Sequence, residues 1–143
     1  MRKSLEKVEK SSRNMPRYCL ETSFLIDFLR GKESAINKYK EIKGEKLETT
    51  SIVAWEVLRG PRLVNRLKEY KEAVRLLNRL RVIPFTFTSA RIASEIEQDL
   101  RKEGMEINPL DVLIAAVVIE NGSILVTRDE DYKHIKGLKV EFY

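Results

Sequence analysis

The alternation of short β-like runs with helical segments constrains the fold of this chain more than any other feature of its sequence. The β-like runs cover residues 17–21, 47–50, 81–85, 124–126 and 138–142. The helical segments cover residues 23–30, 34–42, 51–59, 62–80 and 89–103, and a last one runs from Pro109 to Asn121. Strands that alternate with helices form parallel sheets with helices on both faces. We therefore expect an α/β fold of the three-layer α/β/α type, with a central five-stranded parallel sheet.

Local signals support several helix boundaries. Thr22 and Ser23 are candidate N-caps of the first helix, because their side chains can accept hydrogen bonds from the first helical amides. Gly60 and Pro61 predict the end of the third helix. The segment 62–80 places apolar residues at three- and four-residue steps, which predicts one long amphipathic helix.

The segment from Asn108 to Gly122 is predicted to be the most buried helix. Asn108 and Pro109 are preferred at the N-cap and the first helical position, and the run Val112–Ile119 is apolar on every side. This apolar run is far shorter than the ~20 residues that a helix needs to cross a bilayer. We therefore expect the chain to have no membrane partner.

The chain of 143 residues has the length of one domain. Residues 1–16 are polar and basic and lack the apolar core of a signal peptide. We expect them to form a flexible N-terminal extension, with a single domain at residues 17–143. The missing signal peptide and the single cysteine, Cys19, predict a cytoplasmic protein.

Two residue counts exclude most common catalytic chemistries. One cysteine forbids an internal disulfide and every cysteine-rich zinc site. The single histidine, His134, forbids the zinc sites and acid–base pairs that require two histidines. The chain also lacks the GxSxG motif that presents a nucleophilic serine. Any catalysis must therefore rely on carboxylates, with a hard divalent metal ion as the expected partner.

Four acidic residues fall where a parallel sheet would gather them. Glu21 ends the first predicted strand and Asp129 follows the fourth. Glu56 and Asp111 lie near the starts of their predicted helices. The carboxyl ends of parallel strands and the N-termini of the antiparallel helices share one edge of the sheet. We therefore expect these four side chains to converge.

Each of these acids also has an ordinary structural interpretation. Asp111 could complement its helix dipole, Glu56 could be a solvated helix residue, and Asp129 could belong to a turn. Glu21 is harder to explain in this way, because glutamate is disfavoured at the end of a strand. The remaining candidates near these positions are predicted to be surface residues: Asp27, Glu130, Asp131 and His134.

Clustered carboxylates repel one another, and their pKa values rise unless a cation neutralises them. Mg²⁺ or Mn²⁺ suits such a cluster because hard cations prefer oxygen ligands. A metal ion at this edge would lower the pKa of a bound water and offset the charge of a phosphodiester. The pattern therefore favours metal-dependent phosphodiester hydrolysis.

Positive charge is concentrated in residues 59–81, which we call the basic band. It holds eight Lys and Arg residues against two Glu residues, whereas the net charge of the whole chain is +5. Such a band is typical of a surface that binds an anionic polymer. It is equally typical of a solvated helix face, and charge alone does not decide between the two.

The residues around the four acids resemble the successive motifs of PIN domains. The matching segments are residues 20–27 (LETSFLID), 56–60 (EVLRG), 111–116 (DVLIAA) and 126–129 (VTRD). Their order makes the resemblance more specific than any single segment, and it extends from about Arg17 to Tyr143. It is strongest to the small toxin ribonucleases of VapBC-type toxin–antitoxin pairs.

The resemblance implies a PIN-like fold and an endoribonuclease that cleaves single-stranded RNA with Mg²⁺ or Mn²⁺. By position, the candidate catalytic residues are Glu21, Glu56, Asp111, Asp129 and Thr127. The candidate metal ligands are Glu21, Asp111 and Asp129. Ser23 matches the small polar residue that follows the first acid. The basic band would then bind RNA through Arg59, Arg62, Arg66 and Arg75.

The resemblance also implies a homodimer and a cognate antitoxin. Apolar residues that look exposed on the first two helices predict an interface at Phe24, Phe28, Leu29, Ile36 and Tyr39. An antitoxin would be expected to place an arginine against the acidic residues, because a guanidinium matches carboxylates bidentately.

Glu21 departs from the family pattern, which has aspartate at this position. The extra methylene displaces the carboxylate, and Mg²⁺ tolerates little departure from octahedral geometry. The alternative function is therefore a weakened or inactive PIN-like module that binds RNA or protein. A phospho-accepting receiver domain also uses strand-end carboxylates, but it needs paired acids after the first strand, and Cys19 and Leu20 precede Glu21.

Overall fold

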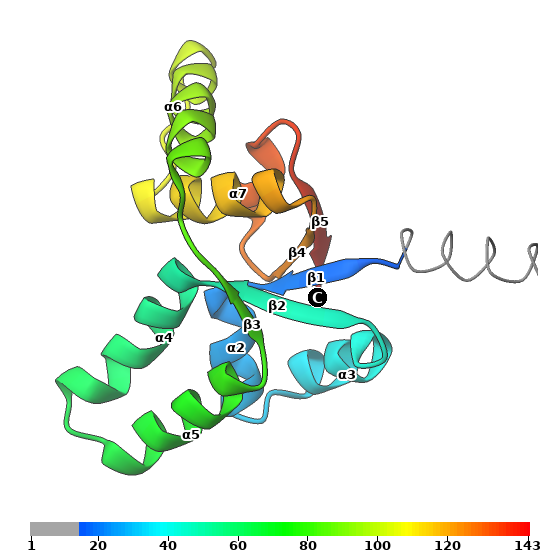
Figure 1. The fold of residues 1–143 in the computed structure, drawn as a ribbon, viewed down its shortest axis with the longest axis vertical. Helices are drawn as coiled ribbons and strands as arrows, with labels where there is room; N and C mark the ends of the chain where they lie inside the picture. Colours follow the sequence, from blue (N-terminus) through cyan, green and yellow to red (C-terminus); the bar gives the residue numbers. More distant parts are fainter. Residues whose placement is uncertain (1–14) are drawn as a thin grey trace, which may run out of the picture.

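The computed structural model describes residues 15–143, so residues 1–14 of the predicted N-terminal extension lie outside the described part. The strands are β1 (Arg17–Leu20), β2 (Lys46–Thr50), β3 (Arg81–Ile83), β4 (Ile124–Thr127) and β5 (Lys139–Phe142). They form one sheet in the order β3-β2-β1-β4-β5, and every neighbouring pair is parallel (Figure 1). The predicted α/β class with a five-stranded parallel sheet is confirmed.

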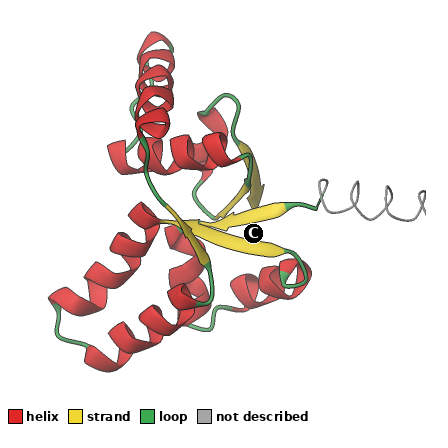
Figure 2. Ribbon diagram, in the orientation of Figure 1, coloured by secondary structure: helices red, strands yellow, loops and turns green. Residues whose placement is uncertain are grey.

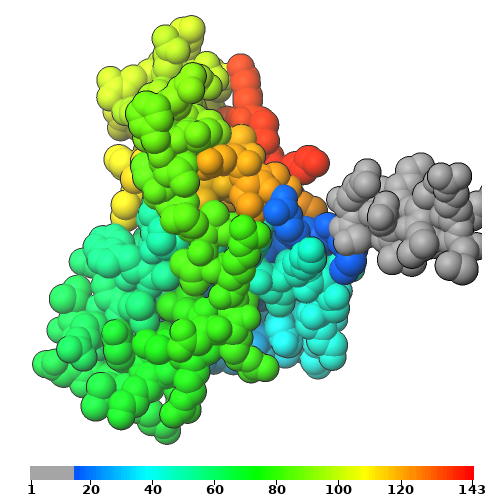
Figure 3. Space-filling view, in the orientation of Figure 1, coloured from blue at the N-terminus to red at the C-terminus, as the bar shows by residue number. Residues whose placement is uncertain are grey.

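Helices cover both faces of this sheet. They are α2 (Thr22–Leu29), α3 (Glu33–Ile42), α4 (Ser51–Leu63), α5 (Leu67–Asn78), α6 (Phe87–Lys102), α7 (Pro109–Asn121) and the 3-10 helix η1 (Glu130–His134). Helices α2 to α5 lie on one side of the strands, and α6 and α7 lie on the other (Figure 2). The three-layer arrangement is therefore as predicted. The α4–α5 pair and α6 project from the body at opposite ends of the molecule (Figure 3).

The strand order reverses at the centre of the sheet. The chain builds β1, β2 and β3 in sequence on one side, and then returns to place β4 on the other side of β1. Leu20 pairs with Val126, and the Glu21 amide donates to the Val126 carbonyl at 3.1 Å, so the carboxyl ends of β1 and β4 are level. Open α/β sheets bind ligands at such a reversal.

Helix α7 forms the centre of the layer on its side, as its apolar sequence predicts. Asn108 caps its N-terminus by accepting from the Leu110 amide at 2.9 Å, and Gly122 ends it with a φ of 70° that favours glycine. Residues 114–118 are all buried. Asp111 therefore sits on the first turn of a rigidly packed helix. Within residues 15–143, no helix is long and apolar enough to span a membrane.

The predicted single helix over 62–80 is wrong. Helix α4 continues through Gly60 and Pro61 to Leu63, and α5 starts at Leu67. The chain reverses at Asn65, whose φ of 56° is tolerated by asparagine better than by most residues. The two helices pack against each other as a hairpin, and we call this pair the α4–α5 arm.

The residues predicted to form an apolar interface on the first two helices are less exposed than the sequence suggests, and Phe28, Leu29, Ile36 and Tyr39 are half-buried. Phe24 is buried, and Phe28, Leu29 and Tyr39 pack against the core. The rings of Phe24 and Phe28 have centroids 6.1 Å apart, and those of Phe28 and Tyr39 are 5.0 Å apart. These side chains fill the space between α2 and α3, because two helices and the end of the chain cover this face together.

Candidate active site

Glu21 lies at the turn from β1 into α2 and is only 5% exposed. Its Oε1 atom accepts hydrogen bonds from the Ser23 amide (3.1 Å), the Ser23 hydroxyl (2.5 Å) and the Thr127 hydroxyl (2.5 Å). Glu21 is therefore the N-cap of α2, in place of the predicted Thr22 or Ser23. The strand ends one residue before the helix begins, so the glutamate has to fold back onto the first turn.

Burial raises the pKa of Glu21, and the negative charge of Glu56 adds to this effect. The hydrogen bonds from Ser23 and Thr127 act in the opposite direction, because they stabilise the charged form. The pKa remains above its ordinary value. Ionised Glu21 thus carries a cost that a nearby cation would relieve.

Two hydroxyl groups connect the end of β1 to the segment after β4. The Thr127 hydroxyl donates to Glu21 and accepts from the Asp129 amide at 3.0 Å. The Ser23 hydroxyl accepts from the Arg128 amide at 3.1 Å. The predicted site residue Thr127 therefore holds the glutamate and the aspartate segment in one hydrogen-bonded unit.

Asp111 lies on the first turn of α7. The hydroxyl of the buried Tyr132 donates to its Oδ1 at 3.0 Å. Burial raises the pKa of Asp111 to about 6, and the negative charges of Glu21, Asp129 and Glu56 contribute to the rise. The Tyr132 hydrogen bond partly offsets this rise. All four predicted acids therefore share one electrostatic environment.

Glu56 and Asp129 complete the group from α4 and from the start of η1. Glu56 accepts from the Thr22 hydroxyl at 2.8 Å, which ties α4 to α2. It also lines a hollow of about 670 Å³ between α2, α4 and α5, with Arg66 on another wall. Asp129 caps η1 by accepting from the Asp131 amide at 3.0 Å.

The ligand atoms that this site offers are of the type that a hard divalent cation prefers. It consists of carboxylate oxygens, and among residues 15–143 no lysine or arginine forms an ion pair with any of the four acids. The same residues contain no group of three or more acidic, histidine or cysteine side chains arranged to hold one ion. The structure thus supplies oxygen ligands and uncompensated charge, without a closed coordination shell.

Asp27 was predicted to be a surface residue, and this is wrong. It is fully buried and accepts from Arg128 Nε at 2.8 Å and from the Tyr143 hydroxyl at 2.7 Å, while Lys32 Nζ lies 3.3 Å away. Burial alone would raise the pKa of Asp27, but hydrogen bonds from Tyr143, Arg128 and Lys32 outweigh it and lower the pKa. Arg128 stands between Thr127 and Asp129, so this contact anchors the site segment to α2.

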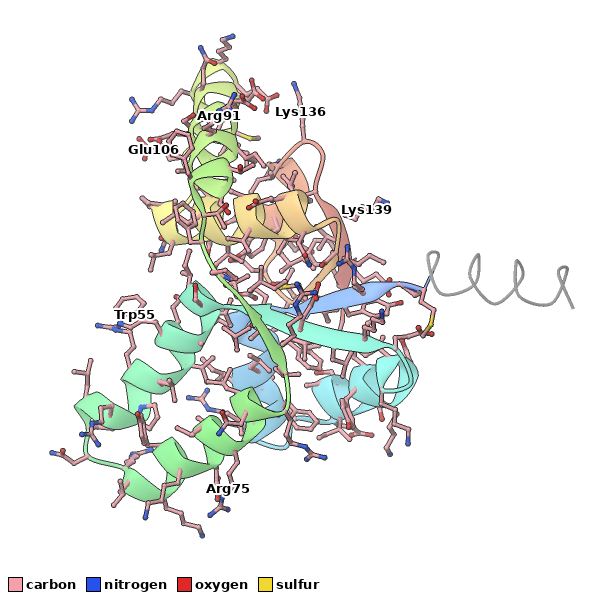
Figure 4. All side chains as sticks on the ribbon, viewed as in Figure 1. Trp55, Arg75, Arg91, Glu106, Lys136 and Lys139 are labelled. Atoms are coloured by element: carbon pink, nitrogen blue, oxygen red, sulfur yellow. The ribbon has the colours of Figure 1, made fainter. Side chains whose placement is uncertain are left out.

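The arginines of the basic band are exposed, as an RNA-contacting role requires. Arg59 and Arg62 lie on α4, and Arg66 precedes α5 and pairs with Glu69 at 3.6 Å. Arg75 lies on α5 and points away from the sheet (Figure 4). The band is therefore spread around the α4–α5 arm, with Arg59 and Arg62 on the helix that also carries Glu56.

Comparisons with known proteins assign the chain to a family. Residues 18–138 match the family described as PIN domain. The chain belongs to the PIN-domain family. The matched range includes Glu21, Glu56, Asp111 and Asp129, and the strand-end geometry described above lies within it.

The relatives of this PIN domain are VapC ribonucleases of low sequence identity. It is 30% identical over 126 residues to ribonuclease VapC1 of Rickettsia felis, which covers 85% of this chain and 92% of the relative. It is 22% identical over 130 residues to the tRNA(fMet)-specific endonuclease VapC of Shigella flexneri, with 89% and 98% covered.

Solved structures show the same fold. VapBC2 from Rickettsia felis, crystallised with a DNA fragment from its promoter, aligns with a TM-score of 0.80 at 24% identity. The alignment covers 89% of this chain and 98% of that one. Two other structural neighbours are VapBC-5 of Mycobacterium tuberculosis, a member of the VapBC family of toxin–antitoxin systems, and a toxin–antitoxin complex from Klebsiella pneumoniae.

Sequence reasoning missed three side chains that support the acids of this PIN domain. Tyr132 contacts Asp111, Thr22 contacts Glu56, and Arg128 anchors the Asp129 segment. Only Arg128 had a local signal, because it lies inside the segment VTRD that carries Asp129. The contacts of Tyr132 and Thr22 join residues far apart in the chain, so no spacing rule predicts them.

Proposed function

We propose that this PIN domain is a Mg²⁺- or Mn²⁺-dependent endoribonuclease that cleaves single-stranded RNA, as the toxin of a VapBC-type pair. One observation carries the proposal. The negative charges of Glu21, Asp129 and Glu56, which come from separate parts of the chain, contribute to the raised pKa of Asp111. The naming of two relatives as a ribonuclease and an endonuclease supports the same reaction class.

Glu21 and Asp111 are the proposed metal ligands, and Asp129 binds directly or through water. A bound metal ion would acidify a water molecule and offset charge on the phosphodiester. Glu56 is exposed enough to orient or deprotonate the attacking water. Thr127 holds Glu21 and the Asp129 segment in position through the hydrogen bonds described above.

The test is cleavage of single-stranded RNA by the Asp111→Asn and Asp129→Asn variants in Mn²⁺. We expect each to lose at least about 100-fold in rate, because loss of groups that only support metal ligands already costs ~10–100-fold. Glu130→Gln is the matched control, since Glu130 is exposed, adjacent to Asp129 and outside the acid group. Full activity in both Asn variants, or in excess chelator, would contradict the proposal.

A homodimer and a cognate antitoxin are proposed partners. The structural neighbours from toxin–antitoxin systems support the antitoxin. An arginine of the antitoxin would match the uncompensated carboxylates of the site in charge and geometry.

The second candidate function is a PIN-like module that binds RNA or protein without catalysis. Two observations favour it: glutamate occupies position 21, and residues 15–143 hold no three-ligand cluster. Calorimetric titration with Mn²⁺ and Mg²⁺, paired with the cleavage assay, separates the two. Metal binding with turnover supports the nuclease, whereas RNA binding without metal binding or turnover supports the module.

A further inference from the structure

The outward face of α4 combines one aromatic ring with arginines. Trp55, Arg59 and Arg62 are four and three residues apart, so they lie along one face of the helix. Val53 and Val57, which are buried, lie on the opposite face. This exposed row therefore has no part in the packing of α4 against the body of the protein.

Cations and aromatic rings are paired along this row. The Arg59 guanidinium carbon lies 5.0 Å from the centroid of the Trp55 ring. The Arg62 guanidinium carbon lies 5.2 Å from the ring of Tyr70, which belongs to α5. Both distances are within the range of cation–π interactions. We call these four residues, Trp55, Arg59, Arg62 and Tyr70, the aromatic–cation row.

Trp55 is the chain neighbour of Glu56, one of the four acids. It immediately precedes Glu56, so their Cα atoms are about 3.8 Å apart. Its side chain is 52% exposed, although tryptophan is highly buried on average. Figure 4 shows it projecting outward from α4, away from the sheet.

We propose that Trp55 is a stacking platform for a nucleobase of single-stranded RNA, close to the phosphate presented to the acids. This proposal rests on the proposed function. Proteins bind single strands by stacking bases on aromatic rings while cations follow the phosphates. Arg59 covers one face of the indole, so the base stacks on the other, and Arg59 and Arg62 lie near the adjoining phosphates. An anionic strand matches this row in charge, whereas a second copy would oppose arginines to arginines.

Trp55 is the only tryptophan in the chain, so intrinsic fluorescence reports on this residue directly. The experiment uses the full chain with Asp111→Asn, in chelator, so that a ten-nucleotide oligouridylate binds without being cleaved. We expect saturable quenching of the Trp55 emission. Quenching that depends on protein concentration and not on RNA would overturn the proposal in favour of self-association.

Trp55→Leu, made in the same Asp111→Asn background, tests the contribution of the ring to affinity. We expect it to weaken oligouridylate binding by roughly 5- to 150-fold, the effect of losing one stacked base, and Trp55→Phe to retain most of the affinity. Leu63→Ala is the control, because Leu63 is an exposed apolar residue of α4 outside the row. Equal affinity of Trp55→Leu and the parent protein would overturn the proposal.

An oligonucleotide of the same length with abasic sites separates stacking from charge. We expect Trp55→Leu to have no effect on its binding, since no base is present to stack. If Trp55→Leu loses the same affinity for the abasic and the normal strand, the ring acts only by positioning Arg59. That result would overturn the stacking role. Stacking without cleavage in Mn²⁺ contradicts only the proposed nuclease, whereas cleavage with unchanged affinity of Trp55→Leu contradicts only the platform.

Discussion

At the scale of single residues, Glu21 shows how this chain accommodates glutamate where the resemblance to PIN domains implies aspartate. The longer side chain folds back over the first turn of α2 and accepts three hydrogen bonds on one oxygen. The extra methylene is therefore absorbed by the capping geometry. Both interpretations of Glu21, as a helix cap and as a site acid, apply to the same carboxylate.

Glu21→Gln should separate these two roles. Glutamine keeps the Oε1 acceptor and the side-chain volume, so the cap survives. It removes a buried charge whose pKa is raised by burial, so we expect a higher melting temperature in chelator. Cleavage should fall by at least about 100-fold, as expected for the loss of a metal ligand. Addition of Mn²⁺ should raise the melting temperature of the parent protein more than that of the variant.

Asp111 predicts a dependence of stability on pH. Its pKa rises from 3.8 to about 6 on folding, so the folded state binds this proton more tightly than the unfolded state. The resulting stabilisation is complete below pH 3.8 and is lost as the pH rises through about 6. Urea unfolding in chelator should show this loss in the parent protein. The Asp111→Asn variant has no carboxyl group that titrates at this position. If its stability depends on pH in the same way as that of the parent protein, the raised pKa of Asp111 is contradicted.

At the scale of elements, the segment after β4 is positioned by α2. Asp27 lies inside α2, and Arg128, Lys32 and Tyr143 all donate to it. The carboxylate is buried while Arg128 and Lys32 are about half exposed, so the aspartate is the indispensable member of the group. A helix that contains none of the four acids within its own bounds thus supports the Asp129 segment.

We expect Asp27→Asn to lower the free energy of unfolding by about 1.5–3 kcal/mol, the usual value of hydrogen bonds to a charged group. Because folding lowers the pKa of Asp27, its contribution is present above its ordinary pKa and is lost as the pH falls. The deficit should therefore be largest near neutral pH. Lys32→Gln is the control and should cost less than about 1 kcal/mol, as is typical of exposed ion pairs.

The α4–α5 arm predicts a salt dependence of RNA binding. Replacing Arg62, Arg66 and Arg75 with glutamine should weaken binding and reduce the slope of log affinity against log salt by about 2, since each phosphate contact contributes ~0.7. Arg91 and Arg101 on α6 are exposed and lie outside the basic band, so Arg91→Gln and Arg101→Gln serve as controls. An unchanged affinity and slope would identify the band as a solvated face.

At the scale of the whole molecule, the apolar surface lies away from the first two helices. Among residues 15–143 the most exposed large apolar side chains include Phe87 at the start of α6 (80%) and Leu63 at the end of α4 (68%). These two residues lie on different helices, and exposed apolar side chains of this size are candidate contacts in an association site. Phe87, the more exposed of the two, is therefore the residue chosen to test the proposed homodimer.

Sedimentation at tens of micromolar should show a dimer, since that range corresponds to an association free energy of roughly −6 to −7 kcal/mol. Phe87→Glu should shift the equilibrium toward monomer. It should leave the melting temperature unchanged, because Phe87 is largely exposed in the folded chain and contributes little burial to stability. A monomer for the parent protein at these concentrations would refute the homodimer.

The sequence by itself determined the alternation of strands and helices and the buried helix α7, and it predicted that the four acids share one sheet edge. These features depend on local periodicity, on capping residues such as Asn108 and on the rule that parallel strands share a carboxyl edge. Glu21 and Asp129 each follow a predicted parallel strand, so the sequence predicted that both lie at one edge of the sheet, and the strand order makes these strands neighbours.

Only the tertiary structure decided the break between α4 and α5, the burial of Asp27 and the support of Asp111 by Tyr132. The break occurs at Asn65, in a helical pattern whose periodicity continues on both sides. Asp27 looks like a surface aspartate until Arg128 and Tyr143 reach it from distant parts of the chain. The physical reason is common to these cases: the free energy of a polar or turn residue depends on partners that chain folding brings together, and local sequence does not contain them.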